Sequence, residues 1–178
     1  VDGAYDLRLV ADGSGVIRVS DSEPLVLDAI ENWVIDTVIE VNSTLDLVDA
    51  TPHGDGIVDA DLGTPGFQIT LRAAIQEANQ LPGPGVISLP AGDYTLALAG
   101  SDEDNAATGD LDIRQDLEII GEAAGQTTID ADGLERVFQI FGGVTVRISD
   151  VTITGGVVVG SEDGGGIRSG GDLTLENV

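Results

Sequence analysis

The sequence predicts an all-β fold, a right-handed parallel β-helix with three short strands in each turn, and three observations support this. Apolar residues make up 42% of the 178 residues but aromatic residues only 3%, so Val, Ile, Leu and Ala must fill the core. The 25 glycines indicate many tight turns. From residue 86 on, short apolar segments recur about every 24 to 30 residues, which is a solenoid period.

Charge and composition exclude several classes of function. The chain has 32 acidic and 7 basic residues, a formal net charge of −25, and the basic residues are all arginine. It has no cysteine, methionine or lysine and a single histidine, which excludes disulfides, thiol nucleophiles, cysteine-ligated zinc and lysine-based mechanisms. Nucleic-acid binding is not expected, because phosphate contacts need a basic surface. The acidic surface fits a high-salt habitat, calcium binding, or both.

The first 37 residues form a segment of their own. Short strand-like segments joined by polar turns are predicted there, and a helix over 26–34 is the alternative for part of them. We interpret 1–37 as a linker, the end of a preceding module or a strand used in assembly. Residues 38–85 are predicted to form an N-terminal cap, with a long loop over 49–66 that is rich in Asp, Gly and Pro.

One helix is predicted over 70–81. Its apolar residues recur at helical spacing along one stripe, Thr70 is positioned to cap its start, and Pro82 and Gly83 end it. We expect this helix to cover the open N-terminal end of the coil, where apolar core and unpaired strand edges would otherwise be exposed.

Residues 86–178 are predicted to form the turns of the β-helix. Three sets of segments repeat: 111–113, 137–140 and 167–169; 117–120, 144–148 and 173–175; 128–130 and 151–154. Stacking would align their Ile, Leu and Val residues into internal ladders, and parallel connections are right-handed by default. The last turn stops after its second strand, so we expect either that the solenoid continues beyond this sequence or that another molecule covers the open turn.

Several stretches resemble the N-terminal part of bacterial surface and secreted right-handed β-helix proteins of the CSLREA type. They read VIEVNSTLDLVDATPHGDGIVDAD, TLRAAIQEANQLPGPGVISLPAGDYTLALAGSDEDNAATGDLDI, LEIIGEAAGQTTIDADGLERVFQI and GGGIRSGGDLTLENV. The likeness runs from about Val38 to the end. The motif that names the family has become TLRAAI, with Thr70 and Ala73 at variant positions, and the cysteines that often precede it are missing, so no role of theirs carries over. The resemblance implies a large, exported protein without known catalysis.

Two acidic loops are candidate calcium sites. Clustered carboxylates in Gly-containing loops can supply the six to eight oxygens that Ca²⁺ prefers, although the spacing is not that of an EF-hand. In each loop the alternative is a solvated acidic turn, and Asp110 or Asp112 could instead accept hydrogen bonds from backbone amides. The candidate ligands are Asp49, Asp55, Asp59 and Asp61 in the first loop and Asp102, Asp104, Asp110 and Asp112 in the second.

A carbohydrate-active site is a weaker alternative. Parallel β-helices include pectate-lyase-like enzymes and polygalacturonases, which use outward-facing carboxylates and an arginine. The nearest set here is Asp130, Asp132, Arg136 and Asp150, and the spacing places Asp150 about one turn after Asp130. No histidine or lysine accompanies the set. The arginines are expected instead to pair with nearby aspartates; these are Arg114, Arg136, Arg147 and Arg168.

We therefore expect a non-catalytic structural or adhesive module, extracellular or at the cell surface. Self-association into a head-to-tail fibre or scaffold, or contact with another surface protein, would use residues 1–37 and the open last turn. Glycan binding or polysaccharide degradation is the alternative function. No membrane insertion is expected, since no window reaches 18 apolar residues.

Overall fold

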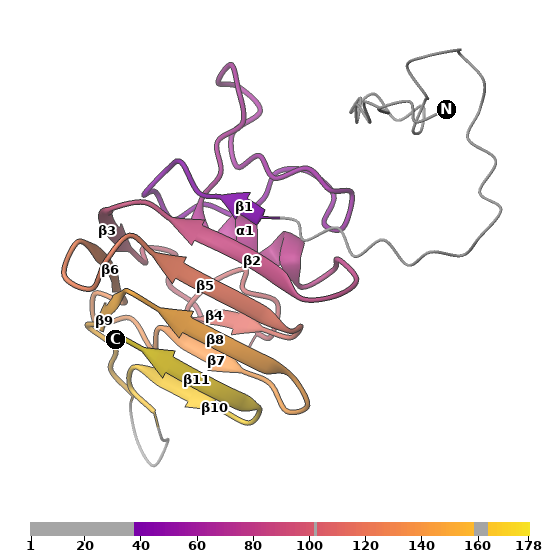
Figure 1. The fold of residues 1–178 in the computed structure, drawn as a ribbon. Helices are drawn as coiled ribbons and strands as arrows, with labels where there is room; N and C mark the ends of the chain where they lie inside the picture. Colours follow the sequence, from indigo (N-terminus) through magenta and orange to yellow (C-terminus); the bar gives the residue numbers. More distant parts are fainter. Residues whose placement is uncertain (1–37, 102, 159–163) are drawn as a thin grey trace, which may run out of the picture. The chain divides into compact units, whose positions relative to one another are not determined.

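The computed structural model describes residues 38–101, 103–158 and 164–178, traced from indigo to yellow in Figure 1. Their regular secondary structure consists mainly of β-strands in parallel sheets, with one short helix. The segments predicted within residues 1–37 lie outside the described part, as does Asp102. In the described ranges, no helix combines the length and apolar character that a membrane span requires.

The described strands form three parallel sheets. The five-stranded sheet has the order β1-β2-β5-β8-β11 and contains Val38–Glu40, Gly85–Leu89, Leu117–Gly121, Thr145–Ser149 and Asp172–Glu176. The second sheet joins β4, β7 and β10, which are Leu111–Ile113, Phe138–Ile140 and Ile167–Ser169. The third joins β3, β6 and β9, which are Gly92–Thr95, Thr127–Asp130 and Thr152–Thr154. Each set of repeated segments predicted from the sequence therefore pairs within one sheet, so this prediction is confirmed.

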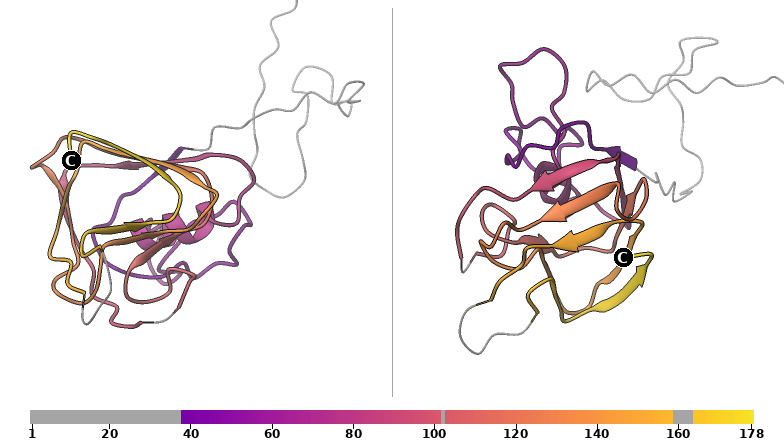
Figure 2. Two further views of the ribbon diagram at one scale, coloured as in Figure 1. Left: turned by 90° about the horizontal axis from the view of Figure 1, so that it is seen from below. Right: turned by 90° about the vertical axis from the view of Figure 1, so that its left-hand side faces the viewer.

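The chain visits the three sheets in a constant order. After β2 it passes through β3 and β4, then β5, β6 and β7, then β8, β9 and β10, and returns with β11 to the first sheet. From β5 on, each strand pairs with the strand formed one cycle earlier. In the left view of Figure 2 strands of successive cycles overlie one another.

The register aligns apolar side chains into buried ladders. In the first sheet, Ile39, Ile87, Ile119 and Ile148 follow one another across four strands, and the last three are fully buried. Leu111 and Phe138 do the same in the second sheet, and Ile129 is fully buried in the third. Burying a side chain of this size contributes about 1.5–3 kcal/mol, so the ladders are the main stabilising feature of the sheets.

The helix α1 spans Leu71–Ala78, within the predicted 70–81. Thr70 caps it as predicted, since its hydroxyl oxygen accepts a hydrogen bond from the Ala73 N–H at 3.1 Å. The last predicted residues form a turn that leads into Gly83, whose φ of +92° is not helical. The prediction of one apolar face was incomplete, because every residue of α1 is buried. The helix packs against β2 and β4, and loops cover its polar side.

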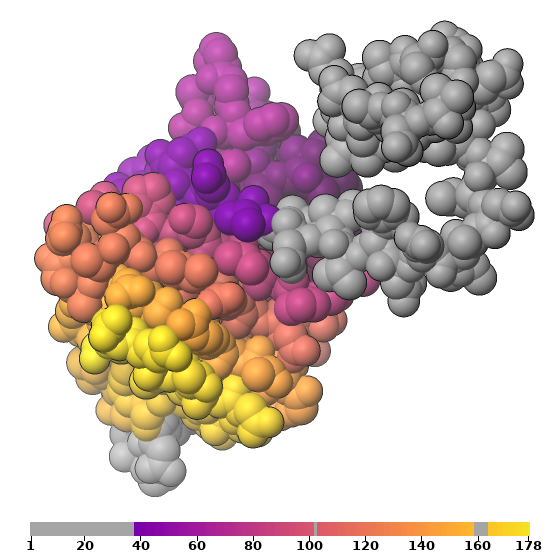
Figure 3. Space-filling view, viewed as in Figure 1, coloured from indigo at the N-terminus to yellow at the C-terminus, as the bar shows by residue number. Residues whose placement is uncertain are grey.

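The core thins from β8 to the last strands. Ile167 and Leu173 are only partly buried, and Leu175, aligned with buried Ile148, is 47% exposed. No described strand pairs with the free edge of β11, which lies at the surface in Figure 3, in yellow.

Candidate functional site

Arg72 is a buried arginine that connects α1 to two loops. Its guanidinium forms a two-pronged ion pair with the Asp46 carboxylate, at 2.6 and 3.1 Å, and both side chains are almost fully buried. It also donates to the carbonyl oxygens of Ala106 at 3.0 Å and Gly109 at 2.8 Å. Asp46 Oδ2, which accepts from Arg72 Nη2, also accepts from the Ala97 and Leu98 amides at 2.7 and 2.9 Å. The sequence interpretation missed this pair, although an arginine inside an alanine-rich apolar helix is a signal for a buried partner.

Glu77 fastens the first acidic loop to the helix. Its carboxylate accepts hydrogen bonds from the Gly54 and Gly56 amides at 2.5 and 2.6 Å, and the side chain is buried. Both glycines have positive φ, at +87° and +82°, a backbone conformation that residues with a Cβ rarely adopt. Glycine at 54 and 56 thus allows the backbone conformation that points both amides at the Glu77 carboxylate. The sequence interpretation did not single out Glu77.

Gln76 of α1 contacts both acidic loops, and Asn79, which caps the end of the helix, contacts the second. Gln76 Oε1 accepts from the Asp49 N–H at 2.9 Å, while its Nε2 donates to the Ala106 carbonyl at 3.1 Å. Asn79 donates to the Asp112 carbonyl at 2.7 Å and accepts from the Arg114 N–H at 2.8 Å. The polar residues of α1 therefore hold the loops in place instead of facing solvent.

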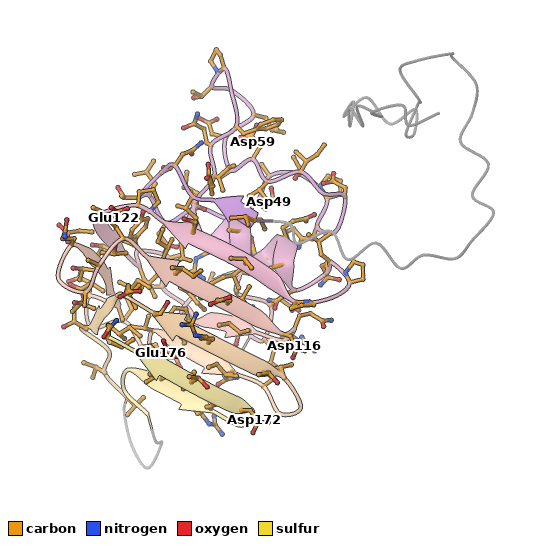
Figure 4. The ribbon with its side chains drawn as sticks, viewed as in Figure 1. Asp49, Asp59, Asp116, Glu122, Asp172 and Glu176 are labelled. Atoms are coloured by element: carbon orange, nitrogen blue, oxygen red, sulfur yellow. The ribbon has the colours of Figure 1, made fainter. Side chains whose placement is uncertain are left out.

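In the first acidic loop, the predicted ligands separate into a buried pair and two exposed residues. Asp49 and Asp59 are each 7% exposed, and the Asp59 N–H donates to Asp49 Oδ1 at 3.2 Å; Figure 4 labels both. Asp55 Oδ1 accepts only from the Ile57 amide, and Asp61 accepts from Gly63 and Thr64. The Thr64 and Gly63 hydrogen bonds lower the pKa of Asp61. The exposed pair stabilises the turns in which it lies.

In the second acidic loop, Asp112 is fully buried and accepts from the Ala106 N–H at 2.9 Å through Oδ2. This matches the expectation that Asp110 or Asp112 serves the backbone. Asp110 instead accepts from Arg136 at 3.2 Å. Glu103, which lies in the same acidic stretch, accepts from the Asn105 and Thr108 amides. The backbone carbonyl of Asp104 accepts from Arg114.

Burial raises the pKa of Asp112 to about 7, and the nearby charges of Asp110, Glu103 and Asp104 add to this effect. The Ala106 hydrogen bond opposes it. Burial also raises the pKa of Asp110, and the Arg136 guanidinium counteracts part of that rise. Asp112 therefore carries its proton at mildly acidic pH, where an exposed aspartate would be ionised.

No three acidic or histidine side chains are grouped as a metal cage within 38–101, 103–158 and 164–178. The seven predicted ligands among these residues thus do not form a group of three or more carboxylates there, Asp102 lies outside them, and calcium binding stays a prediction. Two carboxylate oxygens are relevant to calcium binding. Among the buried side-chain oxygens of the described residues, only Asp49 Oδ2 and Asp112 Oδ1 lack a hydrogen-bond partner.

The alignment expected for a carbohydrate-active site was wrong. Asp130 of β6 is aligned with Thr154 of β9, not with Asp150. Asp150 follows β8 and lies over Gly121, where an added Cβ would come within 2.2 Å of the Asp150 carbonyl oxygen. The Arg136 side chain is buried against Asp110. The error came from counting residues between turns without allowing for connections of different length.

Of the four arginines expected to pair with aspartate, two form ion pairs with acids among the described residues, and Arg114 and Arg168 do not. Arg136 pairs with Asp110 as predicted, whereas Arg147 bridges Glu118 and Glu176 across β5, β8 and β11. The Arg114 guanidinium lies over the Phe141 ring, 5.2 Å from its centroid. Cross-strand pairs of this kind stabilise neighbouring strands modestly.

Comparisons with models of protein families, with curated proteins and with solved structures give no match for this chain.

Proposed function

We propose that this chain is the capped N-terminal section of a right-handed parallel β-helix of the CSLREA type that its sequence resembles, and that it works as an extracellular structural or adhesive module. The observation that carries the proposal is the constant order in which the chain returns to three parallel sheets. A parallel strand connection in one sheet is right-handed in nearly all proteins, so a right-handed coil is the natural continuation of this order.

The proposed division of the chain follows from this coil. Residues 38–85 would be the cap, residues 86–178 the turns, and residues 1–37 a linker, preceding module or assembly strand. The cap assignment is supported by α1, which packs on β2 and β4 at the end of the sheets where the coil begins. A helix there covers apolar side chains that no earlier turn could cover.

The non-catalytic part of the proposal is supported by how the polar side chains are used. The buried ones near α1 bind backbone groups or each other, as Arg72, Gln76 and Glu77 do. These hydrogen bonds hold the loops in place. Because the polar atoms of these side chains are already used in them, the same atoms are not free to bind a substrate. Incubation with pectin, alginate and peptidoglycan tests this directly, and release of reducing ends or unsaturated sugars would contradict a purely structural role.

The assembly part of the proposal concerns the free edge of β11. A further parallel strand would bury Leu175 and the partly buried Leu173 and continue the ladder of the first sheet. That strand would come from a continuation of the polypeptide or from a second copy in head-to-tail contact. The net charge of −25 makes association of copies dependent on salt or divalent cations.

Sedimentation velocity of the 178-residue chain, over a concentration series in high salt, tests assembly. Head-to-tail association predicts a mass that grows with concentration, and Leu175→Lys should abolish the growth. Leu134→Lys is the matched control, because Leu134 is 40% exposed in a turn away from that edge. A monomer at all concentrations would rule out self-association and leave the continuing polypeptide as the source of the next strand.

A further inference from the structure

The first acidic loop contains two buried carboxylates without an ionic partner. Asp49 and Asp59 are each 7% exposed. Among the described residues the arginine ion pairs use Asp46, Asp110, Glu135, Glu118 and Glu176, and none uses Asp49 or Asp59. Buried charges in proteins are paired with an opposite charge or coordinate a metal. No arginine of the described residues therefore neutralises the charge of Asp49 or Asp59.

The hydrogen bonds of both residues leave one side free. Asp49 Oδ1 accepts from the Thr51 N–H, the Thr51 hydroxyl and the Asp59 N–H, at 3.1, 2.8 and 3.2 Å. Asp49 Oδ2 is buried and has no hydrogen-bond partner in the described structure. Asp59 Oδ1 accepts from the Asp61 and Gln68 amides, both at 3.1 Å. Asp59 Oδ2 accepts no hydrogen bond from the described residues, but unlike Asp49 Oδ2 it is not a fully buried atom. Each carboxylate thus orders the loop with Oδ1 and has Oδ2 in reserve.

We propose that Asp49 and Asp59 bind one calcium ion through these reserve oxygens, with backbone carbonyls and water completing its coordination. Ca²⁺ accepts six to eight oxygens in flexible geometry, so two carboxylates suffice as its charged ligands, whereas Mg²⁺ demands near-ideal octahedral geometry. Two charges predict weak binding, with a dissociation constant of about 10⁻⁴ to 10⁻³ M, as in extracellular calcium modules. This inference does not depend on the proposed function.

The proposed calcium site uses fewer residues than the candidate ligands that the sequence suggested for this loop. Asp55 and Asp61 are excluded because they are exposed and accept hydrogen bonds within their own turns. Glu77 is excluded because both of its carboxylate oxygens accept from glycine amides. The site also differs from Asp112, whose unpartnered oxygen is accounted for by protonation.

Calcium titration of the 178-residue chain by calorimetry tests the proposal. About 1 M NaCl shortens the Debye length to about 3 Å and suppresses general attraction of cations to the acidic surface. We expect one bound Ca²⁺, no displacement by a tenfold excess of Mg²⁺, and at least a tenfold loss of affinity in Asp49→Asn and Asp59→Asn. Asp55→Asn is the matched control, since it removes the same charge from the same loop, and its affinity should stay within twofold.

Amide NMR of the unaltered chain gives a second readout that needs no variant to fold. Calcium should shift the Ala50, Thr51 and Asp59–Asp61 amides and leave the Ala106 amide unchanged. The proposal is overturned if no binding occurs below about 10 mM, if Asp55→Asn weakens binding as much as Asp49→Asn, or if the shifts centre on residues 103–112.

Discussion

The two acidic loops lie against the same helix and differ in how each deals with a buried carboxylate oxygen. In the loop over residues 49–61, Asp49 Oδ2 belongs to an aspartate linked to a second buried aspartate by a 3.2 Å hydrogen bond. In the segment over residues 103–112, a loop that leads into β4, Asp112 has an unpartnered Oδ1, and burial together with the charges of three nearby acids raises the pKa of Asp112 to about 7. The comparison suggests that one loop uses a cation and the other a proton to neutralise a charge that water cannot reach.

The helix is the feature that the two loops share. Gln76 binds Asp49 on one side and Ala106 on the other, and Arg72 connects Asp46 with Ala106 and Gly109. A change at a residue of α1 that contacts both sides, such as Arg72 or Gln76, should therefore affect both loops, whereas a change at a residue that contacts only one loop should stay local. The following predictions use this distinction.

Replacing Arg72 with Met should destabilise both loops at once. The substitution leaves the Asp46 carboxylate buried without its partner, which costs about 3–5 kcal/mol. Equilibrium unfolding in urea, at neutral pH, measures the loss. Arg114→Met is the control, because Arg114 is exposed and should cost less than about 1 kcal/mol. Equal losses in the two variants would mean that the buried pair has no special role.

Replacing Asp112 with Asn should change how stability depends on pH. The pKa of Asp112 in the folded chain is about 7, above the value of 3.8 expected when unfolded, so folding takes up a proton between these values. The stability that this residue contributes is thus fully present below about pH 4 and is lost as pH rises to about 7, by on the order of 4 kcal/mol.

Asp112→Asn cannot ionise and should lack this decline. The difference in unfolding free energy between the two proteins, measured by urea unfolding from pH 4 to 8, should shift in favour of the variant as pH rises. The change of this difference with pH is the relevant quantity. Its absolute value is not, because the new amide in Asp112→Asn also leaves a buried N–H group without an acceptor, which costs stability at every pH. A pH-independent difference would mean that Asp112 is ionised throughout.

Replacing Glu77 with Gln should loosen only the first loop. A neutral amide is a weaker acceptor for the Gly54 and Gly56 amides, so the loop should lose about 1.5–2 kcal/mol of local stability. Hydrogen exchange should become faster at these two glycine amides and stay unchanged at Ala106. Faster exchange in both loops would show that they open together.

Asp61 should show the opposite pH behaviour to Asp112, with the smallest effect. Its pKa is lowered by hydrogen bonds from Thr64 and Gly63, so its stabilising contribution is present above the unfolded pKa and is lost as pH falls through the lower folded value. A carboxyl-carbon NMR titration measures this, with the ordinary aspartate value of 3.8 as the reference. Titration of Asp61 above that value would contradict the assignment of these hydrogen bonds.

Local pattern was sufficient for the strands β4 to β11 and for the helix, whereas β1, β2 and β3 were in none of the predicted sets. Apolar residues at alternate positions, separated by Gly and Asp turns, located the three sets of paired strands, and Thr70 with the spacing of Leu71, Ala74 and Ile75 located α1. These features depend on neighbours in the sequence, through turn chemistry and side-chain periodicity. The acidic loops were visible for the same reason, as clusters of Asp in short stretches.

Tertiary packing alone decided what the polar residues do. The pairing of Arg72 with Asp46 spans 26 residues, and the Glu77 contacts with glycine amides span 21 and 23, so no local pattern reveals them. The alignment of Asp150 with Gly121, not Asp130, likewise depends on the length of each connection between sheets. Composition and periodicity state which side chains must be buried, but a carboxylate's partner and pKa arise only when folding brings distant segments together and excludes water between them.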